Sequence, residues 1–231
     1  MTDATLDRRM LLGAAALAVT ASAVTAQAQP APAGPAFTPQ PLPFDPKAVP
    51  GLSEKLLTSH HDNNYVGAVK RLGAIRAEFG KLDPATAPGF AINGLKREEL
   101  IAWNSMILHE VYFNGLRAKE AITPALAQAI ERDFGSLDRW AAEFSGMGKA
   151  LGGGSGWVML TYSPHDKRLV NTWASDHTQT LAGGTPLMVL DMYEHAYHMD
   201  YGAKAGAYVD AYMKAVSWGN ANGAFRRASA A

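Results

Sequence analysis

The segment Asp191-Met-Tyr-Glu-His195, entered from the apolar run 186–190, constrains the fold of this chain more than any other stretch. A short apolar run of this kind predicts a buried strand. The carboxylate of Asp191 should therefore stand at the end of that strand, with the imidazole of His195 on the next turn of the chain. An oxygen and a nitrogen at this spacing can both bind a divalent metal ion, and further histidines would complete the site.

Two predicted helices supply those histidines. Residues 52–79 repeat apolar side chains at steps of three and four, which predicts a long helix whose inward stripe includes His60. A second helix, from about residue 96 to 116, carries His109. The turn-forming stretch 80–89 separates the two. We therefore expect an antiparallel hairpin in which His109 faces His60.

His61, the neighbour of His60, is expected at the surface, because adjacent residues of a helix do not face the same way. His165 is expected to be solvated, since it lies in a predicted hairpin turn at 164–166.

The second half of the chain mixes helices with strands. Strand-like runs lie at 157–162, 169–173 and 187–191. Helices are expected at 124–132, 137–150 and 205–216. The expected fold is therefore α+β, with an N-terminal antiparallel helical hairpin followed by a C-terminal lobe that holds a small antiparallel sheet flanked by helices.

The first 28 residues have the pattern of an export signal. Arg8 and Arg9 precede an alanine-rich apolar stretch that ends near Val24, and Ala26-Gln-Ala28 has the small-x-small form that signal peptidases cut. The arginine pair resembles a twin-arginine signal, which predicts a periplasmic or secreted protein. The apolar stretch, about 15 residues, is shorter than the ~20 that span a bilayer. No stable membrane association is expected after cleavage.

The remainder divides into three expected parts. These are an extended leader rich in proline and alanine (29–50), a helical hairpin domain (51–122) and an α+β domain (123–231). The chain has no cysteine, so nitrogen and oxygen atoms must hold any metal. The 21 Lys and Arg residues balance 21 Asp and Glu residues, which argues against nucleic acid as a partner.

Four blocks of the sequence together resemble the iron/manganese superoxide dismutases. They are residues 52–61, 109–116, 154–157 and 191–197. The resemblance implies four metal ligands, which are His60, His109, Asp191 and His195. It also implies one iron or manganese ion per subunit, superoxide as the substrate, and a homodimer formed through the region of Glu194 and His195. Such a reaction needs a metal that changes its oxidation state, which zinc does not do.

Several positions around the implied site depart from the family pattern. Ala68 stands where the family has its gateway tyrosine, and Tyr65, one turn earlier, is the expected substitute. Asn64 and His198 replace a histidine and a tyrosine that pair across the dimer, and the two replacements can still bond to each other.

The aromatic and cationic surroundings differ as well. Trp157 keeps its usual place near the metal, whereas Phe113 and Tyr193 stand where tryptophan is usual. Ala205 stands near the customary arginine of the substrate funnel, with Lys204 beside it as the nearest cation.

Members of the family hold the metal-bound solvent with a glutamine or, in some, a histidine. Ser105 fills the position for a helical glutamine in this chain, so another group must serve. His177 is the expected group, with Asp176 as the alternative. The resemblance further implies that Glu194 bonds the ligand histidine of the opposite subunit.

Two other functions fit the same ligands. The chain could be a metal-binding protein that keeps this fold with little dismutase activity. It could also be a non-haem iron oxygenase, which needs two histidines, one carboxylate and open coordination positions.

Overall fold

The structure is a computed structural model that describes residues 37–230. These residues belong to one compact unit, Ala31–Ala231. The predicted export signal at 1–28 and the first part of the leader lie outside the described residues. The expected domain boundary near residue 122 stays a prediction. Within residues 37–230, no helix combines the length and the apolar character that a membrane crossing requires.

One continuous helical run carries His60. It consists of α1 (Glu54–Ser59), η2 (His60–Tyr65) and α2 (Val66–Phe79). The side chain of Ser53 starts it by accepting a hydrogen bond from the backbone N–H of Leu56 at 3.0 Å. Segment η2 is a wider π-helical turn, in which the N–H of Val66 reaches back to the carbonyl of His61. The predicted helix over 52–79 is thus confirmed, with an inserted turn at the histidines.

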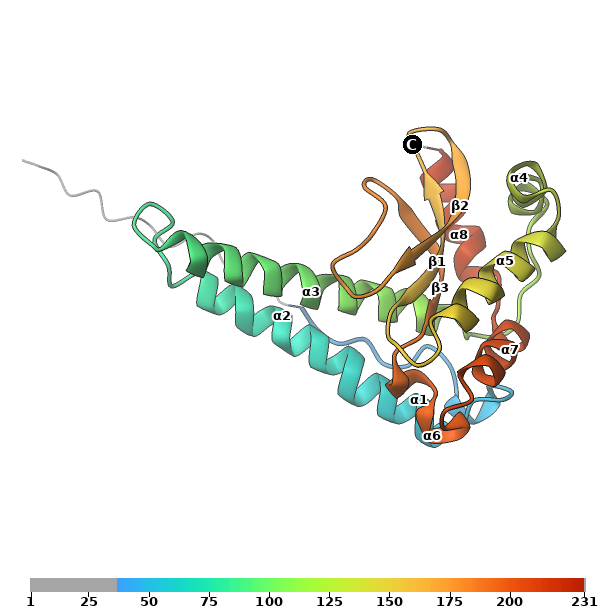
Figure 1. The fold of residues 1–231 in the computed structure, drawn as a ribbon, viewed down its shortest axis with the longest axis horizontal. Coiled ribbons are helices and arrows are strands. Elements are labelled where there is room, and N and C mark those ends of the chain that lie inside the picture. Colours follow the sequence, from blue (N-terminus) through green and yellow to red (C-terminus); the bar gives the residue numbers. More distant parts are fainter. Residues whose placement is uncertain (1–36, 231) are drawn as a thin grey trace, which may run out of the picture. The chain divides into compact units, whose positions relative to one another are not determined.

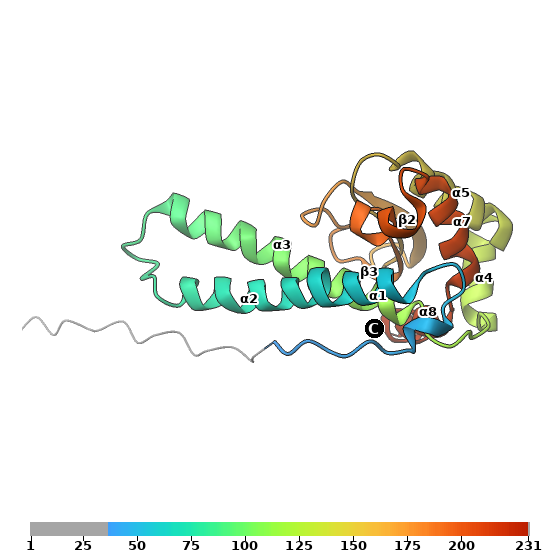
Figure 2. The same ribbon diagram turned by 90° about the horizontal axis from the view of Figure 1, so that it is seen from below.

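The second helix, α3 (Gly89–Asn114), packs antiparallel along α2, as Figures 1 and 2 show. It begins directly after Pro88, earlier than the predicted start near residue 96. Proline is tolerated at the start of a helix because its missing N–H costs no helical hydrogen bond there. The predicted hairpin is confirmed. Leu100, Trp103 and Ile107, however, are partly exposed, since the opposite side of α3 faces the core.

The C-terminal part contains a three-stranded antiparallel sheet in the order β2-β1-β3. The strands are β1 (Trp157–Ser163), β2 (Arg168–Ala174) and β3 (Thr185–Asp191). The surrounding helices are α4 (Pro124–Phe134), α5 (Leu137–Ala150), α7 (Ala205–Ala215) and α8 (Gly219–Ser229). Figure 1 shows α8 and α5 beside the sheet. Contacts of α3 with β3 bring both chain halves together. The α+β prediction is confirmed.

The strand register brings two site residues side by side. Trp157, the first residue of β1, pairs with Asp191, the last residue of β3. A bulge between Leu160 and Thr161 shifts the pairing only toward the far end of the strands. After β3 follow the short η3 (Glu194–Ala196) and α6 (His198–Tyr201). His165 lies exposed in the turn between β1 and β2, as predicted.

The described part of the leader lies against the helices. It contains η1 (Pro46–Ala48), and upstream of it Phe37 packs edge-on against Trp103 at 5.7 Å. The backbone carbonyl of Gln40 accepts a hydrogen bond from Nε2 of His61 at 2.9 Å. His61 is therefore buried, and its predicted surface position is wrong. A helix considered alone has a free outer face here, whereas in the folded chain the leader covers it.

Candidate metal centre

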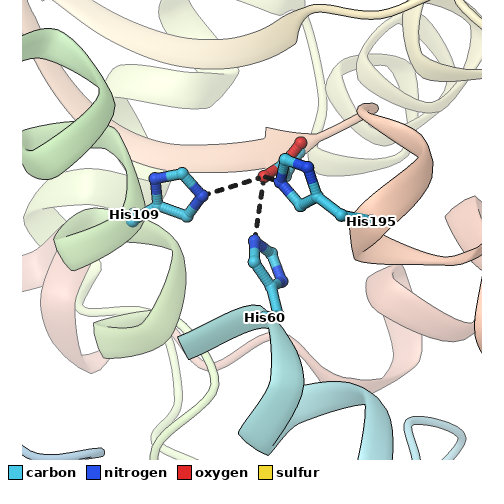
Figure 3. A group of neighbouring side chains, drawn as sticks. His60, His109 and His195 are labelled. Atoms are coloured by element: carbon cyan, nitrogen blue, oxygen red, sulfur yellow. Dashed lines mark hydrogen bonds and ion pairs between the residues drawn. The ribbon is translucent and has the colours of Figure 1, made fainter. Parts of the chain in front are cut away.

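His60, His109, Asp191 and His195 come together at one point. Figure 3 shows how the three imidazoles point toward one another. One nitrogen or oxygen atom from each side chain lies within 4.8 Å of the other three. The four residues come from η2, α3, the end of β3 and η3. The centre therefore joins the helical hairpin to the sheet.

The three imidazoles converge on a single carboxylate oxygen. Oδ2 of Asp191 lies 3.1 Å from Nε2 of His60, 3.2 Å from Nε2 of His195 and 3.5 Å from Nε2 of His109. The other oxygen, Oδ1, accepts a hydrogen bond from the backbone N–H of Tyr193 at 2.8 Å. Asp191 is fully buried, so its charge needs compensation from the groups around it.

The protonation of His109 indicates what belongs between these groups. Burial lowers the pKa of His109 to about 3, so the ring is neutral at pH 7. Its one proton lies on Nδ1, which is 2.6 Å from the backbone carbonyl of Ser105 and donates to it. Nε2 is then a bare lone pair, buried and without a hydrogen-bond partner, that faces the Asp191 carboxylate. Two buried acceptors facing each other repel unless a cation lies between them.

The other buried groups fit a cation as well. Burial lowers the pKa of His60, which favours the neutral imidazole that binds metal ions. Burial alone would raise the pKa of Asp191, but the neighbouring His195 and the hydrogen bonds from His195 and His60 outweigh it and hold that pKa low. Three imidazole nitrogens and one carboxylate suit iron or manganese, which take imidazole and oxygen ligands.

Aromatic rings enclose the centre. Phe113 lies 5.1 Å from the ring of His60, and Trp157 meets His109 edge-on at 5.2 Å. Tyr193 stacks on His195 at 5.4 Å. These three rings thus lie against three of the four convergent side chains, and their roles stay predictions. Such rings keep water away and hold the ligand imidazoles in place.

His177 lies beside the four ligands. Its ring stacks on Tyr193 at 4.8 Å, and its Nδ1 accepts a hydrogen bond from Nε1 of Trp157 at 2.9 Å. The distance from its ring centre to that of His109 is 6.4 Å. The alternative, Asp176, instead accepts hydrogen bonds from the backbone N–H and the hydroxyl of Thr178. This arrangement occupies Asp176 in a local turn.

Ser105 and Tyr65 have partners of their own. The hydroxyl of Ser105 lies 3.4 Å from Nδ1 of His109. The backbone carbonyl of Ser105 is nearer and accepts the hydrogen bond from Nδ1 of His109. The hydroxyl of Tyr65 donates to Oε1 of Glu110 at 3.0 Å and accepts from the backbone N–H of Gln40. The ring of Tyr65 packs against His61 and Phe113. Its gateway role stays a prediction.

The residues expected at a dimer interface lie nearer the surface. Asn64 is half-buried, and both Glu194 and His198 are exposed. Among residues 37–230, Glu194 forms no ion pair. The expected pairs of these residues involve a second subunit and stay predictions. Lys204 is exposed at the start of α7, beside the buried Ala205.

Two contributors to the site were missed by the sequence analysis. The carbonyl of Ser105 sets the tautomer of His109, but every residue has a carbonyl, so only helical spacing could have suggested it. Glu110 accepts a hydrogen bond from the hydroxyl of Tyr65, and no sequence motif links residues 65 and 110.

Comparisons with known proteins agree with this geometry. A family model described as the C-terminal domain of iron/manganese superoxide dismutases matches residues 122–224. An iron superoxide dismutase from Cupriavidus metallidurans is 68% identical over 179 residues, which cover 78% of this chain and 91% of that protein. Two further relatives lie at lower identity. Manganese superoxide dismutase 1 of Halobacterium salinarum is 32% identical, with 82% of this chain and 94% of that protein covered. The iron superoxide dismutase of Aquifex pyrophilus is 31% identical, with coverage of 79% and 88%. The chain belongs to the iron/manganese superoxide dismutase family.

Proposed function

We infer that this protein is a superoxide dismutase that uses iron or manganese to convert superoxide to oxygen and hydrogen peroxide. The observation that carries the inference is the bare, buried Nε2 of His109, which faces Oδ2 of Asp191 at 3.5 Å within a set of three imidazoles and one carboxylate. The 68% identity to an iron superoxide dismutase supports it.

We assign the four convergent side chains as the ligands. Bound iron or manganese supplies a centre that alternates between two oxidation states, so that one superoxide anion loses an electron and the next gains one. The carboxylate of Asp191 contributes the only negative charge of the ligand set. His60 and His109 stay neutral because they are buried.

The second superoxide also needs two protons to leave as hydrogen peroxide. These protons come from solvent, and we assign His177 to holding a water molecule of the site by a hydrogen bond. Because Trp157 donates to its Nδ1, the neutral ring of His177 carries its proton on Nε2. An N–H donor at that atom can bond a water molecule at the metal and influence its affinity for protons. Burial lowers the pKa of His177, which favours the neutral ring.

The test of the main function is superoxide decay after pulse generation, measured with the purified, metal-loaded protein. We expect the decay to accelerate in proportion to protein concentration. His109→Ala should lose both the ion, by metal analysis, and the acceleration. His165→Ala, in an exposed turn, is the matched control and should keep both. An unchanged superoxide lifetime with the loaded wild-type protein would refute the function.

We further propose a homodimer whose interface includes Glu194, His195, Asn64 and His198. Its support is the exposure of Glu194 and His198 next to a ligand, His195, whose side chain is 26% exposed. A carboxylate from a second subunit could accept the second ring N–H of His195. The funnel that leads to the metal would then be lined by both subunits.

We also propose export through the twin-arginine route. Its support is the sequence of residues 8–28 alone. The full-length chain with Arg8→Lys and Arg9→Lys should remain in the cytoplasm of a bacterial host, by fractionation. The same pair of changes at Arg226 and Arg227 is the control and should leave export intact. Equal export of both variants would contradict the proposal.

A further inference from the structure

A contact between α3 and the loop of His177 lies outside the roles assigned so far. Nδ2 of Asn104 donates a hydrogen bond to the backbone carbonyl of His177 at 2.6 Å, across a separation of 73 residues. Asn104 is half-buried and lies five residues before the ligand His109 on α3. Helix α3 therefore carries the metal ligand His109 and, through Asn104, also holds the backbone of His177.

Two residues outside the loop between β2 and β3 donate hydrogen bonds to its backbone. The hydroxyl of Ser155 donates to the carbonyl of Ser175 at 3.3 Å, and Asn104 donates to that of His177. The bonds within the loop are short-range, since Gln179 accepts from the backbone N–H of Ser175 and Asp176 accepts from that of Thr178. Among residues 37–230, the amide of Asn104 is the one side-chain group that hydrogen-bonds the backbone of His177. Local turns give the loop its shape, and among the described residues the bond from Asn104 is the hydrogen bond that ties this loop to α3.

The ring of His177 is fixed by two further contacts. Trp157 donates to Nδ1 at 2.9 Å, and Tyr193 stacks on the ring face with an angle of 15° between the planes. Together with the bond from Asn104, these contacts constrain three different degrees of freedom of His177. The indole N–H sets the tautomer, the stacking sets the ring plane, and the bond from Asn104 sets the backbone position. The hydrogen bond of Trp157 requires that the backbone of His177 stay where Asn104 holds it.

We propose that Asn104 is a positioning residue for His177, which keeps the Nε2–H donor at a fixed place beside the metal centre. This inference rests on the proposed role of His177. A displacement of about 1 Å weakens a hydrogen bond steeply and is costly at an active site. Loss of the Asn104 amide should therefore alter the centre without removing any ligand.

The first test uses metal-free, isotope-labelled protein and follows the indole N–H of Trp157 by NMR, assigned with Trp157→Phe. In Asn104→Ala, its resonance should shift and its hydrogen exchange should be about five- to tenfold faster, as expected for one lost hydrogen bond. Asn104→Asp keeps the shape of the side chain but loses the N–H donor, so it should behave like Asn104→Ala. Asn104→Gln keeps a donor and should restore slower exchange in part.

The matched control is Asn114→Ala. Asn114 lies on the same helix and also donates its amide to a carbonyl, that of Glu110 at 2.8 Å, but within α3 itself. It should leave the Trp157 resonance unchanged. An equal shift in Asn114→Ala, or no shift in either Asn104→Ala or Asn104→Asp, would overturn the proposal.

The second test measures the reduction potential of the metal-loaded variants. We expect Asn104→Ala and Asn104→Asp to move it part of the way toward the value of His177→Ala, with full metal content. A potential that stays at the wild-type value in both would overturn the proposal. If His177→Ala itself changes neither potential nor turnover, the assigned role of His177 fails instead. The NMR test then still decides whether Asn104 positions the loop.

Discussion

At the scale of single residues, the response of the centre to acid depends on His109. Its pKa is about 3 in the folded chain because of burial, compared with about 6.5 in an unfolded chain. Between these two values the unfolded chain binds more protons than the folded one. The stability of the metal-free protein must therefore fall as the pH falls from about 6.5 toward 3.

We predict that His109→Gln makes this dependence shallower. Glutamine does not titrate, so one of the buried groups that resist protonation is removed. The measurement is urea unfolding of the metal-free protein at several pH values between 6.5 and 4. His165→Gln, at an exposed site, is the control and should keep the wild-type slope. A slope equal to wild type in His109→Gln would contradict the buried, neutral state of His109.

Tyr65 gives a second prediction at this scale. Tyr65→Phe removes the donor to Glu110 and the acceptor of the Gln40 N–H. Burial already raises the pKa of Glu110, and the lost hydrogen bond raises it further. We expect the free energy of unfolding to fall by about 1–3 kcal/mol, the range for a partly buried group left without a partner. Metal content should stay complete.

The Tyr65→Phe variant also tests the gateway prediction separately. If Tyr65 takes that role, superoxide decay slows at unchanged metal content. A double variant with Glu110→Gln completes a double-mutant cycle, and strictly additive losses would show that the two side chains are not coupled.

At the scale of elements, α5 illustrates how closely the helices pack on the sheet. A Cβ atom on Gly148 would lie 2.6 Å from Cδ2 of Leu190 and 3.2 Å from Cγ2 of Val209. Both neighbours are fully buried, so neither can move freely. Glycine at this position lets α5 approach both β3 and α7, and β3 ends in the ligand Asp191.

We predict opposite effects for two alanine substitutions on α5. Gly148→Ala should destabilise the chain by about 1–3 kcal/mol through overpacking. Gly146→Ala, two residues away with nothing within 4 Å of its added Cβ, should instead stabilise by roughly 0.5–1 kcal/mol through helix propensity. Thermal unfolding of both variants checks this. A stabilising Gly148→Ala would show that the packing of α5 on β3 is loose.

The elements also show how far the sequence could be interpreted. The inward stripe of 52–79 and the apolar run before Asp191 lead directly to a helix and a strand, since their periods reflect which face is buried. The π-helical turn at His60–Tyr65 carries no such signal. The burial of His61 comes from Gln40 in the leader, a contact between segments that no local pattern encodes.

Among the site residues, the four convergent side chains could be identified because they fall within strong blocks of resemblance. The environment of His177 could be expected only in part. Its bond from Trp157 and its stacking on Tyr193 depend on strand register and on the course of a loop. The contact from Asn104 depends on both chain halves at once.

At the scale of the whole molecule, the dimer is the property to test. In a twofold interface each contact occurs twice. We predict that Glu194→Ala weakens the dimer roughly a hundredfold or more, because two charge-assisted hydrogen bonds are lost, each contributing about 1.5–3 kcal/mol. Analytical ultracentrifugation over a range of concentrations measures this.

Glu131→Ala is the control for that measurement. Glu131 is also an exposed glutamate, but it lies on α4, away from the metal ligands in sequence and on a different element. It should sediment as the wild type does. If Glu194→Ala dissociates no more readily than Glu131→Ala, the proposed interface is wrong.

The pairing of Trp157 with Asp191 provides a way to distinguish correctly folded molecules of this chain from misfolded ones. Side chains alternate between the two faces of a sheet, so a slip of β3 by one residue along β1 would turn the Asp191 carboxylate to the opposite side. A molecule that has folded with this error could not complete its ligand set. The fraction of chains that retain an ion after dialysis is thus a lower bound on the fraction with correctly paired sheets.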